Sequence, residues 1–255
     1  MDIKWLTFAA AACIGAGAQG ETLKYSFNDF EAGPISGQHE WNTYDKVPDT
    51  SALSIMDQVG TSEADGDKAL VIKASKTPIR CVTGEPVRWL PGYTLEAEFD
   101  FKIAADPREL IIPKPVMSVM VGNALLSPKA RWEVKLEASP SGDWVLTGAM
   151  PDESSKRIYG ENFLIRENNA VSISQWYKMR LVSKKLTEPD SFETRVEILG
   201  AESGELIAEI EFSDNKKDKV AKEMWNTSRA HIGFFAPDTQ LGLVCIDNLT
   251  ITSSK

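Results

Sequence analysis

Residues 94–103 read TLEAEFDFKI, and this stretch decides the fold. Apolar side chains fill every second position, and charged side chains fill most of the positions between them. Successive side chains of a β-strand point to opposite faces, so the pattern predicts a strand with one buried and one solvated face. Such strands are typical of antiparallel sheets, because parallel sheets are covered on both faces and give continuous apolar runs.

The same alternation recurs along the chain, and turn-forming residues separate the repeats. WEVKLEA (132–138), YKMRLV (177–182), FETRVEIL (192–199) and LIAEIEF (206–212) all alternate, with SPSGD (139–143), TEPD (187–190) and LGAESGE (199–205) between strands. Many short strands at regular spacing predict an all-β fold, a two-sheet antiparallel β-sandwich. The predicted core includes Leu95, Phe99, Phe101, Trp132, Val134, Trp176, Met179 and Ile232. Residues 213–225, SDNKKDKVAKEMW, are the exception and favour a short helix.

The first twenty residues have the pattern of a signal peptide. Lys4 precedes an apolar stretch, and Ala16-Gly17-Ala18 fits the small-residue rule for cleavage. We therefore expect residues 1–20 to be removed and residues 21–255 to form a single secreted or periplasmic domain with no membrane insertion. Cys13 lies in a weak lipoprotein-like sequence, which makes a lipid anchor the less favoured alternative.

The formal net charge of −9 limits the partners of the chain. Nucleic acid binding requires a basic stripe that neutralises phosphates, so we expect no nucleic acid partner. Two cysteines, Cys81 and Cys245, remain after cleavage. Their spacing does not reveal whether they pair, and we expect two buried free thiols, with a disulfide as the alternative.

Four segments carry a family resemblance: FNDFEAGPISGQHEW (27–41), DKALVIKAS (67–75), QWYKMRLV (175–182) and HIGFFAPDTQLGLVCIDNLTI (231–251). In this order they resemble the secreted bacterial concanavalin A-like (laminin-G-like) jelly-roll domains, over essentially the whole mature chain. The resemblance implies a glycan or polysaccharide partner. Our first hypothesis is a secreted carbohydrate-binding domain. The alternatives are a polysaccharide-degrading enzyme and a structural or adhesion domain of the cell envelope, because this fold serves many functions.

Two sets of residues are candidates for catalysis. Glu96, Glu98 and Asp100 lie on one strand face, and glycoside hydrolysis uses a pair of carboxyl groups. However, acidic residues alternate in the same way on the other strands, so a solvated face explains them equally well. Polysaccharide lyases of this fold use Tyr or His as the base beside a neutralising side chain, which makes His39, Tyr159, His231 and Arg88 candidates. None of these forms a recognisable cluster in the sequence.

Loop aromatics offer a binding site of a different kind. Trp41, Trp89 and Trp225 lie in or beside predicted loops, and sugar rings stack on exposed aromatic rings. We predict that they converge on one rim as a stacking platform. The polar side chains that would orient the sugar are Asn42, Arg88 and Asn226.

The resemblance also implies a structural calcium ion. Carbohydrate-binding jelly rolls place an acid after the first strand and an Asp on the last strand, and these two strands lie side by side. Glu31 and Asp247 match these positions. Calcium needs several oxygen ligands, which backbone carbonyls of residues 31–37 would complete. Alternatively, Asp247-Asn248 forms a bulge in the last strand and Glu31 caps a loop.

Overall fold

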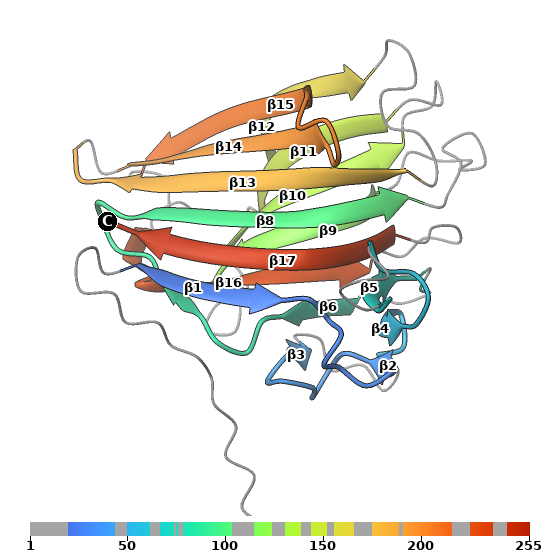
Figure 1. Ribbon diagram of the computed structural model, residues 1–255. Helices are drawn as coiled ribbons and strands as arrows, with labels where there is room; N and C mark the ends of the chain where they lie inside the picture. The colour runs from blue at the N-terminus through green and yellow to red at the C-terminus, as the bar shows by residue number, and fades with distance from the viewer. Residues whose placement is uncertain are drawn as a thin grey trace, which may run out of the picture.

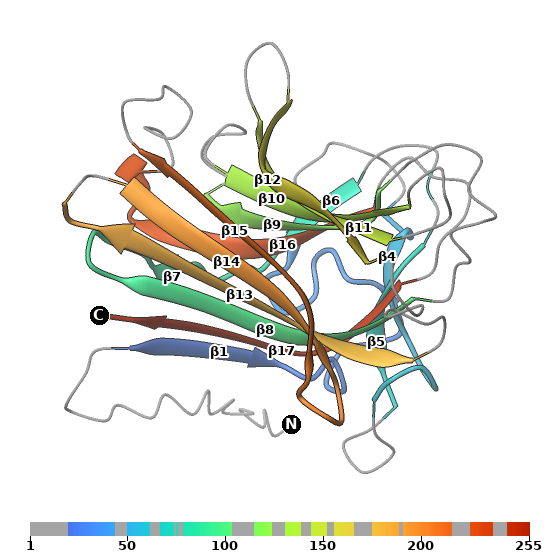
Figure 2. The same cartoon turned by 90° about the horizontal axis from the view of Figure 1, so that it is seen from above.

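A computed structural model of the protein describes residues 20–43, 50–61, 67–73, 75, 79–103, 115–123, 131–138, 144–151, 156–165, 175–188, 191–215, 225–236 and 244–255. Nearly all of them lie in antiparallel strands or in the turns between strands. The strands form two sheets that pack face to face, which confirms the predicted β-sandwich (Figure 1). Figure 2 shows the two layers from above. Within this described part, no helix is long and apolar enough to cross a membrane.

Sheet A contains, in spatial order, β15 (Leu206–Asn215), β14 (Ser191–Gly200), β13 (Trp176–Leu186), β8 (Thr94–Ile103), β17 (Val244–Ser254), β5 (Ala69–Ile72), β4 (Leu53–Met56) and β2 (Gly33–Pro34). The strand β1 (Glu21–Tyr25) also belongs to this sheet and pairs with β17. The first and last strands therefore lie side by side, as the family resemblance implied (Figure 1).

Sheet B contains β12 (Lys156–Ile165), β11 (Trp144–Pro151), β10 (Arg131–Ala138), β9 (Pro115–Gly122), β16 (Arg229–Ala236), β6 (Ile79–Val82) and β3 (Asn42–Thr43). The short strand β7 (Val87–Arg88) pairs with one end of β16. Both sheets are built from strands that are distant in sequence, such as β9 beside β16 and β8 beside β17.

The core lies between the two sheets and follows the predicted alternation. In β8 every second side chain is buried, and Phe99 contacts Phe234 of sheet B edge-on, with the ring centroids 5.3 Å apart. Seven of the eight predicted core residues lie in this core: Leu95, Phe99, Phe101, Trp132, Val134, Met179 and Ile232.

Trp176 was wrongly predicted as a core residue. In β13 the inward positions begin at Tyr177, so Trp176 points to the outer face of sheet A and is half-buried there. Its ring packs against a small cluster that includes Val71 and Cys245, and the Lys102 ammonium lies 4.7 Å from the ring centroid. An aromatic residue at the start of a strand is compatible with either face, and the strand register decides which one it takes.

The predicted helix over residues 213–225 is also wrong in its first part. Residues 213–215 continue the strand β15, and a single helical turn is present at residues 225–226. Residues 216–224 lie outside the described residues.

Both cysteines of the predicted mature chain are free and buried, as we expected. Cys81 lies in the core between the sheets, whereas Cys245 lies in the small cluster on the outer face of sheet A. Burial raises the pKa of the Cys81 thiol to about 12, so that this thiol stays protonated and unreactive.

A buried lysine closes one end of the sandwich. The Lys185 side chain points inward and is only 1% exposed. Its ammonium group donates hydrogen bonds to the backbone carbonyls of Trp225 (3.1 Å) and Thr227, and it lies 4.2 Å from the centroid of the Trp89 ring. Lys185 thus ties the 225–227 segment to β13. Burial lowers the pKa of its side chain to about 7.

This lysine predicts a pH-dependent stability. The unfolded chain keeps Lys185 protonated up to about pH 10.4, whereas the folded chain releases the proton near pH 7. Raising the pH from about 7 to about 9 should therefore increase the free energy of unfolding of the wild type relative to Lys185→Met, by on the order of 2 kcal/mol. Urea unfolding of both proteins at the two pH values measures this difference. A difference that stays constant with pH would contradict a buried neutral amine.

Candidate functional site

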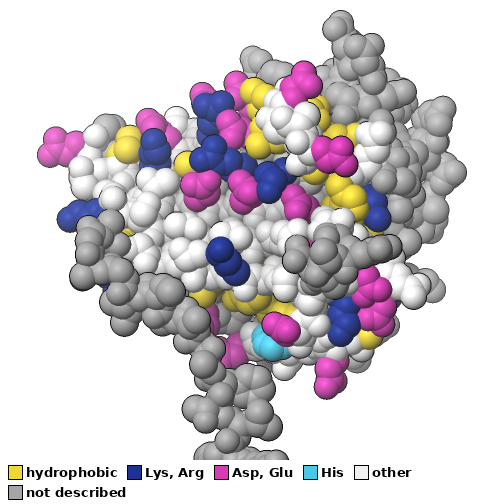
Figure 3. Space-filling view, in the orientation of Figure 1, with side chains coloured by type: hydrophobic (Ala, Val, Ile, Leu, Met, Phe, Trp, Pro, Cys, Tyr) yellow, Lys and Arg dark blue, Asp and Glu magenta, His cyan; other side chains and the backbone are white. Residues whose placement is uncertain are grey.

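The acidic face of β8 is neutralised by basic side chains of β13. Arg180 Nε lies 2.5 Å from Glu96 Oε1. Lys178 Nζ lies 2.7 Å from Glu98 Oε1 and 3.5 Å from Asp100 Oδ1. These ion pairs explain the alternating acids as a charged outer face of sheet A, without a catalytic role (Figure 3).

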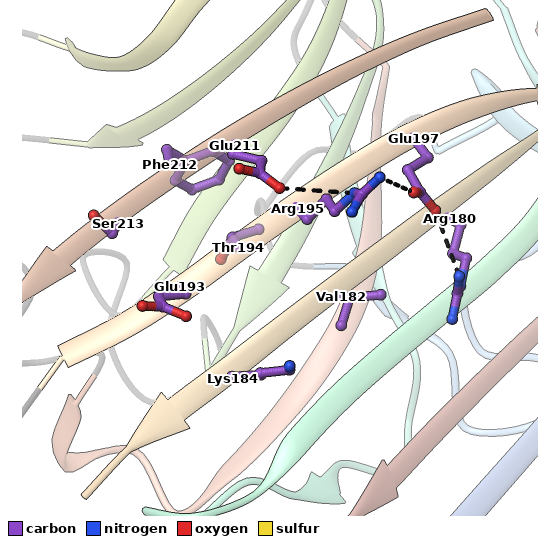
Figure 4. Close-up of a pocket in the computed structure, with 10 residues that line it drawn as sticks. All are labelled: Arg180, Val182, Lys184, Glu193, Thr194, Arg195, Glu197, Glu211, Phe212 and Ser213. Carbon is purple, nitrogen blue, oxygen red and sulfur yellow. Dashed lines mark hydrogen bonds and ion pairs between the residues drawn. The ribbon is translucent and has the colours of Figure 1, made fainter. Parts of the chain in front are cut away.

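A shallow depression of about 600 Å³ lies farther along the same face, over β13, β14 and β15 (Figure 4). Its charged side chains balance one another. Arg195 Nη2 lies 2.8 Å from Glu197 Oε1 and 2.7 Å from Glu209 Oε2, and Arg180 Nη1 lies 3.5 Å from Glu197 Oε2. The side chain of Arg195 is 46% exposed. Exposed, mutually paired charges of this kind are typical of a solvated surface, so we do not assign the site here.

The predicted platform of loop aromatics is wrong, because two of its three rings are in the core. Trp41 and Trp89 are both fully buried. Trp41 stacks on Phe234 with the ring centroids 6.2 Å apart, and Trp89 donates its indole N–H to the Ser183 carbonyl at 3.4 Å. Trp225 is half-buried in the helical turn.

The polar residues assigned to the platform have local roles. Asn42 Nδ2 donates to the Glu40 carbonyl at 2.5 Å. The Arg88 backbone N–H donates to Glu21 Oε2 at 2.7 Å, and Asn226 is exposed in the turn beside Trp225. Without the two buried rings, these side chains do not define a sugar-binding surface.

The opening segment 27–41 shows why Trp41 is buried. Gln38 holds the loop together, because its side chain accepts a hydrogen bond from the Glu31 N–H at 2.8 Å and donates to the Glu31 and Pro34 carbonyls. His39 and Glu40 both have positive φ angles, 43° and 64°, which turn the chain sharply back toward the core. The loop therefore folds over the end of the sandwich and delivers Trp41 inward.

The residues proposed to hold calcium do not fit a metal site. Asp247 is 3% exposed, and its carboxylate accepts hydrogen bonds from the Thr61 N–H, the Thr61 hydroxyl and the Asn248 N–H, at 2.8–2.9 Å. The register of β17 against β8 shifts immediately after Asp247, so this residue anchors a bulge. Among the described residues, no group of three His, Cys, Asp or Glu side chains could hold a metal ion.

The candidate lyase bases differ in their surroundings. His39 is exposed, its ring packs against Phe30, and its Nε2 atom lies 3.2 Å from the Asp29 carbonyl, which fits a role in the turn. Tyr159 lies in β12 opposite Gly148, but its side chain lies outside the described residues. His231 is 5% exposed on β16, and its Nδ1 atom lies 2.5 Å from the Thr83 carbonyl.

The outer face of sheet B differs sharply from that of sheet A. In β10 the side chains of Trp132, Val134 and Leu136 lie in the core, so those of Arg131, Glu133 and Lys135 point to the opposite face. These three charged residues are nevertheless only 8%, 7% and 4% exposed. Ser118 and Met120 on β9, Thr147 on β11 and His231 on β16 point to the same face and are also buried.

Strand register brings these side chains together. Arg131 and His231 both lie opposite Gly122, which has no side chain to separate them. Glu133 lies opposite Met120, and Lys135 lies between Ser118 and Thr147. Residues on neighbouring strands that share a face are about 5 Å apart, so this face carries a compact set of polar groups.

Ion pairs hold the charged residues of β10. Arg131 Nε lies 2.8 Å from Glu133 Oε1, and Lys135 Nζ lies 3.6 Å from Glu133 Oε2. Charged side chains are rarely buried unless they are paired, and burying them costs free energy that hydrophobic residues would not cost. A solvated sheet face does not ordinarily carry buried charges, so this face stands out from the outer face of sheet A. We take the outer face of sheet B as the candidate site.

No feature of the sequence separates this face from a solvated one. RWEVKLE (131–137) alternates in the same way as TLEAEFD (94–100), and we predicted a solvated face for both. The burial of Arg131, Glu133 and Lys135 is a tertiary property, which alternation within one strand does not contain.

No protein-family model and no curated protein matches the chain. Solved structures do match it. An endo-1,3-β-glucanase from Streptomyces sioyaensis has a TM-score of 0.54 and 13% identity, over 96% of this chain and 99% of the other. An alginate lyase in complex with alginate trisaccharide has a TM-score of 0.52 and 10% identity, over 90% and 97%. Lectin I from Ulex europaeus, in complex with a methyl glycoside of α-L-fucose, has a TM-score of 0.52 and 9% identity, over 92% and 98%.

At these identities the likeness defines the fold alone. The chain has the concanavalin A-like jelly-roll fold, as its sequence resemblance implied. Lectins and polysaccharide-degrading enzymes share this architecture, so function has to be argued from the site.

The buried ion pairs predict unequal costs for two matched substitutions. Glu133→Gln removes the charge of a buried carboxylate that contacts both Arg131 and Lys135 and should lower the free energy of unfolding by about 3 kcal/mol. Glu98→Gln breaks a pair in which both side chains are about one-third exposed and should cost under about 1 kcal/mol. Urea denaturation of both variants measures the difference. Equal costs would show that the outer face of sheet B is as solvated as that of sheet A.

Proposed function

We propose that the protein binds a carbohydrate chain on the outer face of sheet B. The observation that carries the proposal is the buried, ion-paired row Arg131, Glu133 and Lys135, on a face that the sandwich core does not need. Carbohydrate sites orient their ligands with a few placed polar groups in a surface that excludes water. Hydrogen bonds in such surroundings are stronger than hydrogen bonds in bulk water.

The chemistry of the neighbouring side chains suits a ligand rich in hydroxyl groups. Arg131 and Lys135 donate hydrogen bonds, Glu133 accepts them, and the Thr147 hydroxyl does both. Solved structures with this fold support the proposal, since they include a lectin in complex with a fucoside and an alginate lyase in complex with alginate trisaccharide. A signal peptide in residues 1–20 would direct the protein to the periplasm or outside the cell, where polysaccharides are available.

A retaining or inverting glycosidase fits this face poorly. Glu133 and Glu137 are four residues apart on β10, so their Cα atoms are about 13 Å apart, and the Thr147 hydroxyl donates to Glu137 Oε2 at 3.5 Å. The two carboxyl groups of glycosidases lie about 5–9.5 Å apart. In addition, the Glu133 carboxylate is held in ion pairs with Arg131 and Lys135, which suits a charged binding group better than a general acid.

A polysaccharide lyase is the second candidate, and His231 favours it. The Thr83 carbonyl can only accept a hydrogen bond, so His231 carries its proton on Nδ1. Burial lowers the pKa of His231, which keeps the imidazole neutral and leaves Nε2 as an acceptor. In this reaction Nε2 would remove the proton next to a uronate carboxylate. The electron pair would form a carbon–carbon double bond, and the glycosidic oxygen would leave and take up a proton.

Ultraviolet absorbance of the unsaturated product tests this second candidate directly. Wild-type protein incubated with alginate would produce a rising absorbance if it is a lyase, and His231→Gln would abolish the rise, because the amide cannot act as a base. Binding of alginate without any rise in absorbance would support the carbohydrate-binding function and contradict alginate lyase activity.

The binding proposal predicts that substitution of two ion-paired lysines has different effects on glycan affinity. Lys135→Gln removes a donor from the outer face of sheet B and should weaken glycan binding by about tenfold, the effect of losing a charged hydrogen bond. Lys178→Gln removes a lysine from the outer face of sheet A and should leave binding unchanged. A glycan array followed by calorimetry on the array's ligand measures both.

The array also separates the proposal from the alternative of a structural or adhesion domain. Wild-type protein that binds no glycan would contradict carbohydrate binding. Loss of binding in Lys178→Gln instead of Lys135→Gln would indicate a site on sheet A and contradict the proposed site on sheet B.

A further inference from the structure

One polar group on the outer face of sheet B has no partner among the described residues. The Ser118 side chain is fully buried, and its hydroxyl oxygen makes no hydrogen bond there. Its neighbours along the strand, Met117 and Val119, lie in the core, so Ser118 points outward. Leaving a buried hydroxyl unpaired destabilises a protein, and such groups are rare enough that each needs an explanation.

The surroundings of Ser118 suggest an explanation for its unpaired hydroxyl. Strand register places Phe235 of β16 on one side of Ser118 and Lys135 of β10 on the other. Thr147 of β11 continues the row beyond Lys135. The Phe235 ring is half-buried on this face, and the Arg80 guanidinium carbon lies 5.3 Å from its centroid. The row therefore passes from an aromatic ring to a small hydroxyl, then to an ammonium and a second hydroxyl.

We propose that Ser118 is a specificity-determining residue that hydrogen-bonds one sugar unit of the bound glycan. This inference rests on the proposed carbohydrate-binding function. The sugar would present its C–H face to Phe235. Because Ser118 and Lys135 are buried in the free protein, neighbouring side chains would have to move aside for a sugar oxygen to reach the Ser118 hydroxyl and the Lys135 ammonium. Sugars combine an apolar face with a polar edge, and the row Phe235–Ser118–Lys135 offers the complementary pair of surfaces.

The role would explain a serine at this position. Among the described residues Ser118 stabilises nothing through its hydroxyl, so an alanine would be the more stable choice for the free protein. Residues that bind ligands commonly reduce stability in this way. A ligand-binding serine and a structural serine therefore predict opposite effects on stability and affinity.

Ser118→Ala tests the inference. Calorimetry would use wild type and variant with three probes, an alginate oligosaccharide, a 1,3-β-glucan oligosaccharide and methyl α-L-fucoside, followed by thermal unfolding without ligand. We expect the probe that binds wild type to bind Ser118→Ala about three- to tenfold more weakly, as for one lost hydrogen bond. The unfolding midpoint should stay the same or rise.

Ser54→Ala is the matched control. Ser54 is 3% exposed on the outer face of sheet A, and its hydroxyl donates to the Ser51 carbonyl at 2.5 Å. Removing this satisfied hydroxyl should lower the unfolding midpoint and leave glycan affinity unchanged.

The outcomes separate this inference from the proposed function. Wild type that binds none of the three probes and no glycan on the array would overturn both. Wild-type binding that Ser118→Ala leaves unchanged would overturn the role of Ser118 alone and keep the carbohydrate-binding function. A lower unfolding midpoint in Ser118→Ala would also overturn it, because the hydroxyl would then be structural.

Discussion

The contact between Phe99 of sheet A and Phe234 of sheet B is the constraint on which the rest of the structure depends. It fixes the inner face of β8 and of β16, and strand geometry then assigns every other residue of both strands to a face. Glu96 and Glu98 must point away from the core on one side, and His231 must do so on the other. Each sheet thus has an outer face whose composition is free to serve purposes other than folding.

The two outer faces differ in how deeply their charged side chains are buried. On sheet A, cations and acids pair at the surface, where each pair contributes little to stability. On sheet B, the pairs around Glu133 are buried and Ser118 has an unpaired hydroxyl among the described residues. Both features reduce stability relative to an apolar face, and the proposed ligand binding would account for them.

Local pattern was enough to predict the sandwich but not the site. Alternation in residues 94–103 correctly predicted the strand, its inner face and the antiparallel sheets. The turn residues around Trp41 and Trp89 suggested exposure, but the depth of each ring depends on how its loop folds over the core. Glu133 and Glu98 occur in the same local pattern, and only the tertiary structure distinguishes the buried carboxylate from the exposed one.

The central claim is that the ligand binds to sheet B and not to sheet A. Chemical-shift mapping of backbone amides tests it most directly, with alginate and 1,3-β-glucan oligosaccharides titrated into the labelled protein. The account predicts that the largest shifts fall in β9, β10 and β16, around Ser118, Glu133 and His231. Shifts confined to β8, β13 and β14, the strands of the charged outer face of sheet A, would contradict it.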